Sequence, residues 1–488
     1  MQVFRTKIKI IGLLLLLVIG CGRQETAATP APLGAPALPA TPTLALPAAL
    51  ESPAMAGGRS IGDPYAPELG NTGYDVQRYT LRLALDPAVE TIVSVAAIDA
   101  VATISNLAQI SLDFVGFEIE QVTVADSPVP FTRVDKKLIV PLPRPLAEGE
   151  SFTVTVAYRG TPVKEPSPYV GFAQALGLHF VGNETIYVLS EPDGARYWFP
   201  SNDHPRDKAT FRFELTVPEG LTAAANGRLL DSQSSASQSL PGGAGSTFTW
   251  EHNYPMATYL AVVAVGVYER IDDAASGGIP LRHYVFPELR PEFETATAVT
   301  GEALAWMSDL FGPYPFEAYG YVTADVPGAS LETQTMVLLS SNMVGQSTVI
   351  HELAHMWFGN WVSLDSWSEM WRNEGFATYV TLMWQHRDDP EALELEIEAI
   401  RTAVAENEPQ YPLGNPPPER LFGFNTYFKG ALLVHALRQE IGDEAFFAGL
   451  RAYFQRYGGA TASDAEFQAV MEEAAGQSLD TFFAEWLN

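Results

Sequence analysis

Residues His351 to Trp361 read HELAHMWFGNW, and this stretch holds two histidines one helical turn apart. On a helix, residues i and i+4 lie on the same face, so the imidazoles of His351 and His355 would point the same way. Two histidine nitrogens in this arrangement suit a zinc ion, and Glu352 would lie beside it as a carboxylate able to take a proton from water. The same spacing also occurs in ordinary packed helices, so the remainder of the chain has to decide.

A catalytic zinc site usually takes three protein ligands, and the candidate for the third is Glu374. It lies in WRNEGFATY, with eighteen residues between it and His355, and it begins a run with helical spacing. Alone, Glu374 could equally be a carboxylate at a helix start, stabilised by the helix dipole. Combined with the two histidines at this distance, it predicts one Zn²⁺ per chain held by His351, His355 and Glu374, with Glu352 as general base.

The 488-residue chain is strongly acidic, with 58 Asp and Glu against 29 Lys and Arg and a formal charge of −29. Such a surface repels phosphate backbones and excludes nucleic acid as a partner. The length predicts more than one domain. A hydrophobic content of 47% with 11% aromatic residues indicates well-filled cores.

The N-terminus has the pattern of an export signal. Three basic residues precede an apolar run from Ile10 to Ile19, too short for a comfortable membrane span, and Cys21, the only cysteine, follows it. This resembles a bacterial lipoprotein signal, in which the cysteine is lipidated.

We therefore expect a signal peptide at residues 1–20 and a lipid on Cys21. The expected location is extracytoplasmic and membrane-anchored, on the cell surface or the periplasmic side. A plain signal peptide or an uncleaved anchor is the alternative. Residues 21–62, rich in Ala, Pro and Thr, are expected to form an extended tether.

Hydrophobic periodicity divides the remaining chain. In RYTLRLALD and FTVTVAYRG, apolar residues alternate with polar or small ones, which is typical of half-buried strands. Beyond residue 271 apolar residues recur at three- and four-residue spacing, and Ser463 with Glu466 forms a capping-box pattern at a helix start. We therefore predict an α+β multidomain fold. An N-terminal antiparallel β domain would span residues 63–270, and a mostly helical domain carrying the metal site would span residues 271–488.

With these motifs, the sequence resembles the aminopeptidase N family of gluzincin zinc metallopeptidases. That family combines His-Glu-x-x-His, eighteen residues and a glutamate in an NEGFA-like context, and NEGFA occurs here at residues 373–377. Further segments resemble family stretches, so that the likeness covers residues 62–488: GDPYAPELGNTGYDVQRYTL, EPDGARYWFPSNDHPRDKATFRFELTVP, NYPMATYLAVVAVG and YFKGALLVHALRQEIG. The resemblance implies a thermolysin-like catalytic domain and the removal of N-terminal residues from peptides.

The resemblance also implies roles for individual residues. Glu332, in GASLETQT, falls where the family has its Gly-Ala-Met-Glu-Asn glutamate, and Glu191, in SEPDGAR, falls where the family holds the substrate amine. Tyr427, in NTYFKG, matches the tyrosine that stabilises the developing oxyanion. The family loop before its glutamate lines the substrate backbone, and its residues here are Ala329, Ser330 and Leu331.

These carboxylates would favour a free N-terminus, because an α-amine is largely an ammonium at pH 7. The chain departs from the family in the loop that keeps only Glu332, and at Arg372, where leucine is usual. It ends at FFAEWLN, without the large helical domain that caps the site in many members, so we expect an open cleft. Three alternatives stay open: a zinc endopeptidase with an open cleft, an epoxide-hydrolysing variant, and a catalytically silent lipoprotein that binds peptides.

Overall fold

The computed structural model describes residues 54–488 apart from 172–174, 237–239, 241–243, 276 and 408. The predicted signal peptide, Cys21 and most of the tether therefore lie outside the described residues. Residues Met55–Asn488 form one compact unit. None of the helices described in this part combines the length and the apolar character that crossing a membrane requires.

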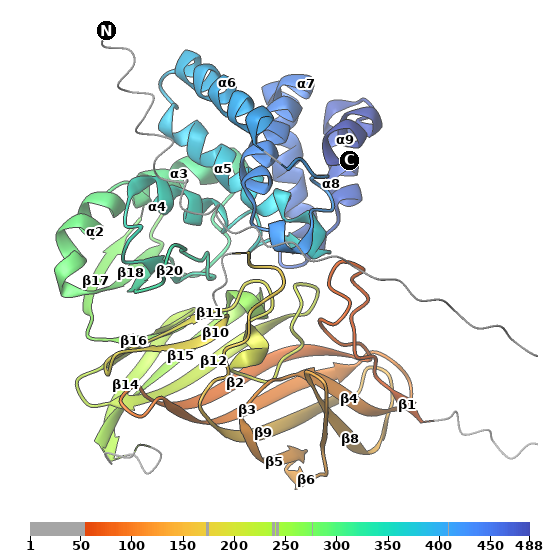
Figure 1. Cartoon of the computed structure of the whole chain (residues 1–488), viewed down its shortest axis with the longest axis vertical. Coiled ribbons are helices and arrows are strands. Elements are labelled where there is room, and N and C mark those ends of the chain that lie inside the picture. The colour runs from red at the N-terminus through yellow and green to blue at the C-terminus, as the bar shows by residue number, and fades with distance from the viewer. Residues whose placement is uncertain (1–53, 172–174, 237–239, 241–243, 276, 408) are drawn as a thin grey trace, which may run out of the picture. The chain divides into compact units, whose positions relative to one another are not determined.

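The first part of this unit is built of strands (Figure 1). Its largest sheet has eight strands in the order β14-β15-β12-β2-β3-β9-β5-β6, and two four-stranded sheets have the orders β1-β4-β8-β7 and β10-β11-β16-β13. The strands are β1 (Met55–Ala56), β2 (Tyr74–Asp86), β3 (Thr91–Ala102), β4 (Leu107–Asp113), β5 (Glu118–Val124), β6 (Ser127–Pro128), β7 (Thr132–Val134), β8 (Lys137–Leu146), β9 (Ser151–Gly160), β10 (Gly177–Val181), β11 (Thr185–Leu189), β12 (Lys208–Pro218), β13 (Thr222–Ala225), β14 (Arg228–Ala236), β15 (Ala244–Ala257) and β16 (Val263–Gly266). Two short 3₁₀ helices, η2 (Ala195–Tyr197) and η3 (Thr258–Leu260), lie between them.

The alternation of apolar and polar residues in the sequence predicts which side chains of a strand are buried. In β2, Tyr79, Leu81 and Leu83 are buried, whereas Thr80 and Arg82 are not. The ladders are antiparallel except that β2 pairs with β12, and β1 with β4, in parallel. The prediction of an antiparallel domain over residues 63–270 is therefore wrong at the pairing of β2 with β12, whereas β1 precedes the predicted domain. Alternation determines which side chains share a face, but it carries no information about which strand becomes the neighbour.

The second part begins with strands and is then mostly helical, which confirms the predicted succession of a β-rich part and a helical part. Its larger sheet has the order β17-β18-β19-β20, and β21 pairs with β22 in a second, two-stranded sheet. The elements are β17 (Glu269–Ala274), β18 (Pro280–Val285), η4 (Pro287–Leu289), α2 (Arg290–Thr297), α3 (Thr300–Phe311), β19 (Tyr321–Ala324), β20 (Val337–Ser340), α4 (Gln346–Ala354), β21 (Ser363–Leu364), η5 (Trp367–Glu369), α5 (Trp371–Gln385), α6 (Pro390–Glu406), η6 (Pro418–Arg420), α7 (Phe424–Tyr457), β22 (Thr461–Ala462), α8 (Asp464–Ala475) and α9 (Asp480–Leu487).

Two helices show how sequence and environment select their form. At the start of α8, Ser463 and Glu466 form the predicted capping box, so orphan amides of the first turn are satisfied locally. In α5 every residue from Trp371 to Trp384 is buried. A helix that is buried on all faces has no polar stripe, and it lies at the centre of its domain rather than on its surface.

The strand part and the helical part share an apolar core where they meet. Trp367 of η5 and Met370, the residue before α5, belong to the same buried cluster as Tyr259 of η3. The Trp367 and Tyr259 rings pack edge to face, with their centroids 5.1 Å apart. Nearby, the Lys208 ammonium of β12 donates to the carbonyl of Asn360 at 2.8 Å. This junction lies next to the residues that the sequence singles out.

Candidate metal and active site

Three side chains from α4 and α5 converge on one point. His351 lies in α4, His355 caps its C-terminal end, and Glu374 lies in the first turn of α5. Nε2 of His351 is 3.1 Å from Oε2 of Glu374 and 3.2 Å from Nε2 of His355. Nε2 of His355 is 3.6 Å from the same oxygen of Glu374. The structure thus brings the three predicted ligand atoms together.

This triangle has the dimensions of a zinc site. Ligands about 2.0–2.2 Å from a tetrahedral zinc ion lie about 3.3–3.6 Å from one another. The three separations, 3.1, 3.2 and 3.6 Å, lie within about 0.2 Å of that range, so one ion fits between the three atoms. The Nδ1 atom of His355 donates to the carbonyl of Phe358 at 3.1 Å, which orients the ring and leaves Nε2 free to coordinate.

Tyr427 reaches this site because α5 and α7 cross at two glycines. A Cβ atom on Gly375 would lie 2.7 Å from the carbonyl carbon of Gly430, and one on Gly430 would lie 2.9 Å from the Cα of Gly375. Only glycine permits so close an approach of two helix backbones. The ring of Tyr427, three residues before Gly430, stacks near that of His351, with centroids 6.1 Å apart.

Three further carboxylates surround the ligand triangle. Glu191 follows β11, Glu332 lies in the connection from β19 to β20, and Glu352 follows His351 in α4. Carboxylate oxygens of Glu191, Glu332 and Glu374 lie within 4.8 Å of one another, and those of Glu332 and Glu352 lie equally close to a nitrogen of His355. All three are at most 6% exposed.

The electrostatics of this cluster favour a positive charge at its centre. Burial and then the neighbouring carboxylates raise the pKa of Glu191 well above its ordinary value, and burial does the same for Glu352. Burial also raises the pKa of Glu332. Burial would raise the pKa of Glu374 too, but the two histidines lower it to about 2. Burial would lower the pKa of His355, yet the carboxylates raise it to about 10. Buried carboxylates in such excess are stabilised when cations, such as a metal ion or an ammonium group, bind among them.

The loop before Glu332 is held by backbone contacts. Leu331 forms a bridge with Leu338 through two backbone hydrogen bonds of 2.9 and 3.0 Å, and its side chain is buried in the core. The Ser330 hydroxyl accepts from the amide of Ser340 at 3.1 Å. Ala329 and Ser330 are partly exposed. The carbonyl of Glu332 itself accepts from the side chain of Asn360 at 2.7 Å.

Two residues of this site were not singled out in the sequence. Asn360 lies at the end of HELAHMWFGNW, and its side chain ties the loop after α4 to the Glu332 loop. Tyr259 is buried, and burial, followed by the charges of Glu332, Glu191 and Glu374, raises its pKa well above the ordinary value. Tyr259 occurs in NYPMATYL, but no spacing rule connects that segment with residues 68 or more positions away.

Comparisons with known proteins agree with this geometry. The family model described as the peptidase M1 N-terminal domain matches residues 75–260, and the peptidase family M1 domain matches residues 299–486. Aminopeptidase M1 of Arabidopsis thaliana is 28% identical over 61% of this chain, and aminopeptidase N of Streptomyces lividans is 27% identical over 62%. The chain spans only 36% and 38% of the length of these two curated relatives.

Solved structures match over a larger share. The M1 zinc metallopeptidase from Deinococcus radiodurans is 30% identical, with a TM-score of 0.80, covering 88% of this chain and 97% of that one. A variant of that protein has been solved with a Tyr-Ser-Ala substrate, with a TM-score of 0.78.

Proposed function

Because the chain belongs to the M1 family of peptidases, we propose that it is a zinc-dependent aminopeptidase that removes N-terminal residues from peptides. The observation that carries this proposal is the convergence of His351, His355 and Glu374 to within 3.1–3.6 Å, beside a group of buried carboxylates. The aminopeptidase relatives and the peptide-bound neighbour support the substrate class. We further propose that the helical part has a thermolysin-like arrangement, supported by the two histidines on one helix and the glutamate on the next.

In this proposal His351, His355 and Glu374 hold one zinc ion. When bound, the ion supplies Lewis acidity, lowering the pKa of a water molecule and polarising the scissile carbonyl. Glu352 takes the proton from the attacking water and delivers it to the leaving amine, so that the proton is conserved over the cycle. The hydroxyl of Tyr427 donates a hydrogen bond to the carbonyl oxygen as negative charge develops there.

The carboxylates of Glu191 and Glu332 bind the α-ammonium of the substrate. They lie within 4.8 Å of each other, so a single ammonium can contact both. Pairing at this point sets the scissile bond one residue inward from the N-terminus. The backbone of Ala329, Ser330 and Leu331 is proposed to lie along the substrate.

The test compares an aminoacyl anilide that has a free amine with its N-acetylated twin, using the full-length protein. We expect cleavage of the free-amine compound alone and its loss on chelation. Glu191→Gln should reduce kcat/KM for that compound. The matched variant Glu184→Gln, at an exposed carboxylate in the turn between β10 and β11, should not. Equal cleavage of the acetylated compound would favour an endopeptidase, and zinc binding without cleavage of either would favour a peptide-binding protein.

We also propose that the protein is an extracytoplasmic lipoprotein anchored through Cys21, with residues 21–62 as a tether. The support is the basic and apolar pattern before the single cysteine. Cells grown with a labelled fatty acid should yield labelled protein in the membrane fraction. Cys21→Ala should abolish the label, and label that persists in this variant would contradict the proposal.

A further inference from the structure

The turn that carries Glu374 is held from two sides by buried polar side chains that the proposed chemistry does not use. The chain enters α5 through η5, and the amide of Glu374 donates to the carbonyl of Met370 at 3.1 Å. The direction of the Glu374 carboxylate therefore depends on how the segment from Asp365 to Arg372 is fixed.

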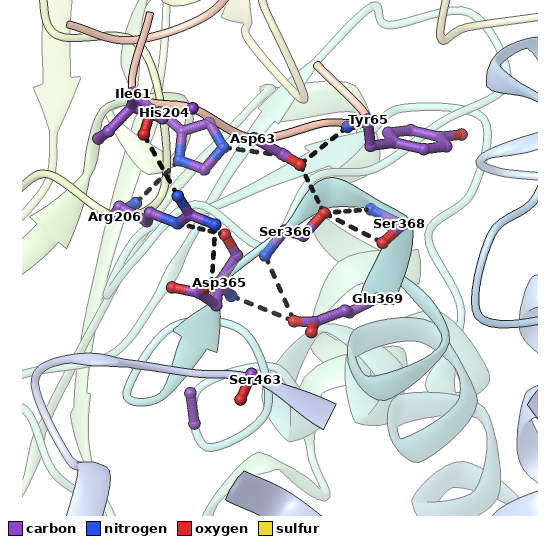
Figure 2. Close-up of polar contacts among 12 residues, drawn as sticks. Ile61, Asp63, Tyr65, His204, Arg206, Asp365, Ser366, Ser368, Glu369 and Ser463 are labelled. Atoms are coloured by element: carbon purple, nitrogen blue, oxygen red, sulfur yellow. Dashed lines mark hydrogen bonds and ion pairs between the residues drawn. The ribbon is translucent and has the colours of Figure 1, made fainter. Parts of the chain in front are cut away.

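The first support is Asp63, about 300 positions earlier in the chain (Figure 2). Its carboxylate is fully buried and accepts hydrogen bonds from the hydroxyl of Ser366 at 2.7 Å and from the amide of Trp367 at 3.0 Å. It also accepts from the amide of Tyr65 at 3.0 Å and contacts Nε2 of His204 at 3.1 Å. Asp63 thus fastens the segment before β2 to the N-terminal end of η5.

Arg206 strengthens the same attachment. Its guanidinium donates to the carbonyl of Asp365 at 2.6 Å and to the Asp365 carboxylate at 2.8 Å (Figure 2). It also donates to the carbonyl of Ile61 at 3.3 Å. The start of the Asp365–Arg372 segment is therefore bound both to the N-terminal segment and to the loop before β12.

Glu369 links this first support to a second one. With Ser366 it forms a capping box, in which its carboxylate accepts from the amides of Asp365 and Ser366, both at 3.3 Å. The same carboxylate accepts from the amide of Asp464, at the start of α8, at 2.9 Å. It also accepts from the guanidinium of Arg372.

Arg372 is the second support, and its side chain is only 4% exposed. Nε donates to the Asp464 carboxylate at 2.7 Å, and Nη1 donates to the hydroxyl of Tyr453 in α7 at 2.8 Å. Nη2 donates to the carbonyl of Ala462 in β22 at 2.5 Å as well as to Glu369. One guanidinium thus joins the first turn of α5 to β22, α7 and α8.

Arg372 and Glu374 are two residues apart, so their side chains leave the helix in different directions. Arg372 extends toward α8, whereas Glu374 extends toward the histidines of α4. Without the guanidinium, the carboxylates of Glu369 and Asp464 would face each other unneutralised, and their repulsion would displace the turn.

We propose that Arg372 and Asp63 are positioning residues that fix the segment from Asp365 to Arg372 and so keep the Glu374 carboxylate aligned with His351 and His355. Neither side chain has a hydrogen bond to His351, His355 or Glu374. The inference rests on the proposed zinc site. Groups that hydrogen-bond a metal ligand directly typically change metal affinity by about 10–100-fold when they are removed, and Arg372 and Asp63 act one contact further from the ligands. We therefore expect a loss at the lower end of that range, about 10-fold, for Arg372→Gln and for Asp63→Asn.

The experiment measures the zinc Kd of the full-length protein by competition with a chromogenic chelator. Thermal unfolding of the zinc-free protein is recorded in parallel. Arg372→Gln and Asp63→Asn should each weaken zinc binding by about 10-fold. Arg372→Lys keeps the positive charge and the folded state but loses the planar set of guanidinium donors. It should therefore raise the zinc Kd too, but by less than Arg372→Gln.

The matched control is Arg438→Gln. Arg438 also contacts α5, through the hydroxyl of Tyr379 at 3.2 Å, and it pairs with Asp443, but it does not bind the first turn. Its zinc Kd should equal that of the wild type.

Each result supports or overturns the inference. If Arg372→Gln, Arg372→Lys and Asp63→Asn lower the unfolding temperature of the zinc-free protein but keep the wild-type zinc Kd, both residues are only structural and the inference is wrong. If the wild type itself binds no zinc, the proposed function fails and this inference fails with it.

Discussion

Replacing Gly430 by alanine would insert a methyl group at the point where α5 and α7 cross. The new Cβ would lie 2.9 Å from the Cα of Gly375. Carbon atoms in contact are normally about 3.5–4.0 Å apart, so the helices would have to separate by roughly 0.6–1 Å. Glu374 adjoins one side of this crossing and Tyr427 adjoins the other, so the separation would move them apart.

The expected size of the effect differs between stability and activity. Overpacking costs about 1–3 kcal/mol, while the higher helix propensity of alanine returns about 1 kcal/mol. The net loss of stability should therefore be between roughly zero and 2 kcal/mol. A displacement of about 1 Å at reacting groups lowers the rate by about 10²-fold. We thus expect Gly430→Ala to stay folded and to lose most of its activity.

The assay measures kcat/KM on a free-amine aminoacyl anilide together with the unfolding temperature. Gly301→Ala is the matched control, because Gly301 lies in α3 and a Cβ there would meet atoms only at 3.8–4.0 Å. This control should keep full activity. Wild-type activity in Gly430→Ala would show that the site does not depend on the close approach of α5 and α7.

Tyr427→Phe should lower kcat by about 10²–10³-fold, the usual loss for an oxyanion donor. It should leave the zinc Kd and the unfolding temperature unchanged, because the Tyr427 hydroxyl makes no hydrogen bond within the described part of the chain. An unchanged kcat would exclude the oxyanion role. For Asp63, burial would raise the pKa, but the hydrogen bonds that it accepts lower it to about 2. Its stabilisation is therefore complete above about pH 4 and is lost as the pH falls toward 2. The stability difference between zinc-free wild type and Asp63→Asn should shrink over that interval, and a constant difference would refute the assignment. Ser463→Ala should cost about 1 kcal/mol of unfolding free energy through the lost cap of α8, with kcat/KM unaffected.

Much of the site could be predicted because its information is local. The spacing of His351 and His355 depends only on helix geometry, and the structure brings their nitrogens to 3.2 Å. The predicted family is confirmed by the domain matches at residues 75–260 and 299–486. The capping box of Ser463 is local in the same way, because it spans one helical turn.

Other features depend on contacts between distant segments, and periodicity cannot reveal them. Asp63 lies beside a proline in a loop, where nothing marks it as a partner of η5. The role of Arg372 as a link between α5 and α8 depends on Asp464, 92 positions later. The parallel pairing of β2 and β12 is equally non-local. The helix α5 is buried on every side, so its hydrophobic pattern gives no face from which its neighbours could be inferred.

A zinc titration of the chelated full-length protein, with bound zinc and activity followed in the same samples, tests the central claim most directly. If His351, His355 and Glu374 form the single metal site of an aminopeptidase, cleavage of a free-amine anilide should be absent without zinc. It should then rise in proportion to bound zinc and reach its plateau at one equivalent per chain. Activity in the fully chelated protein, or a plateau reached only at two equivalents, would contradict the account.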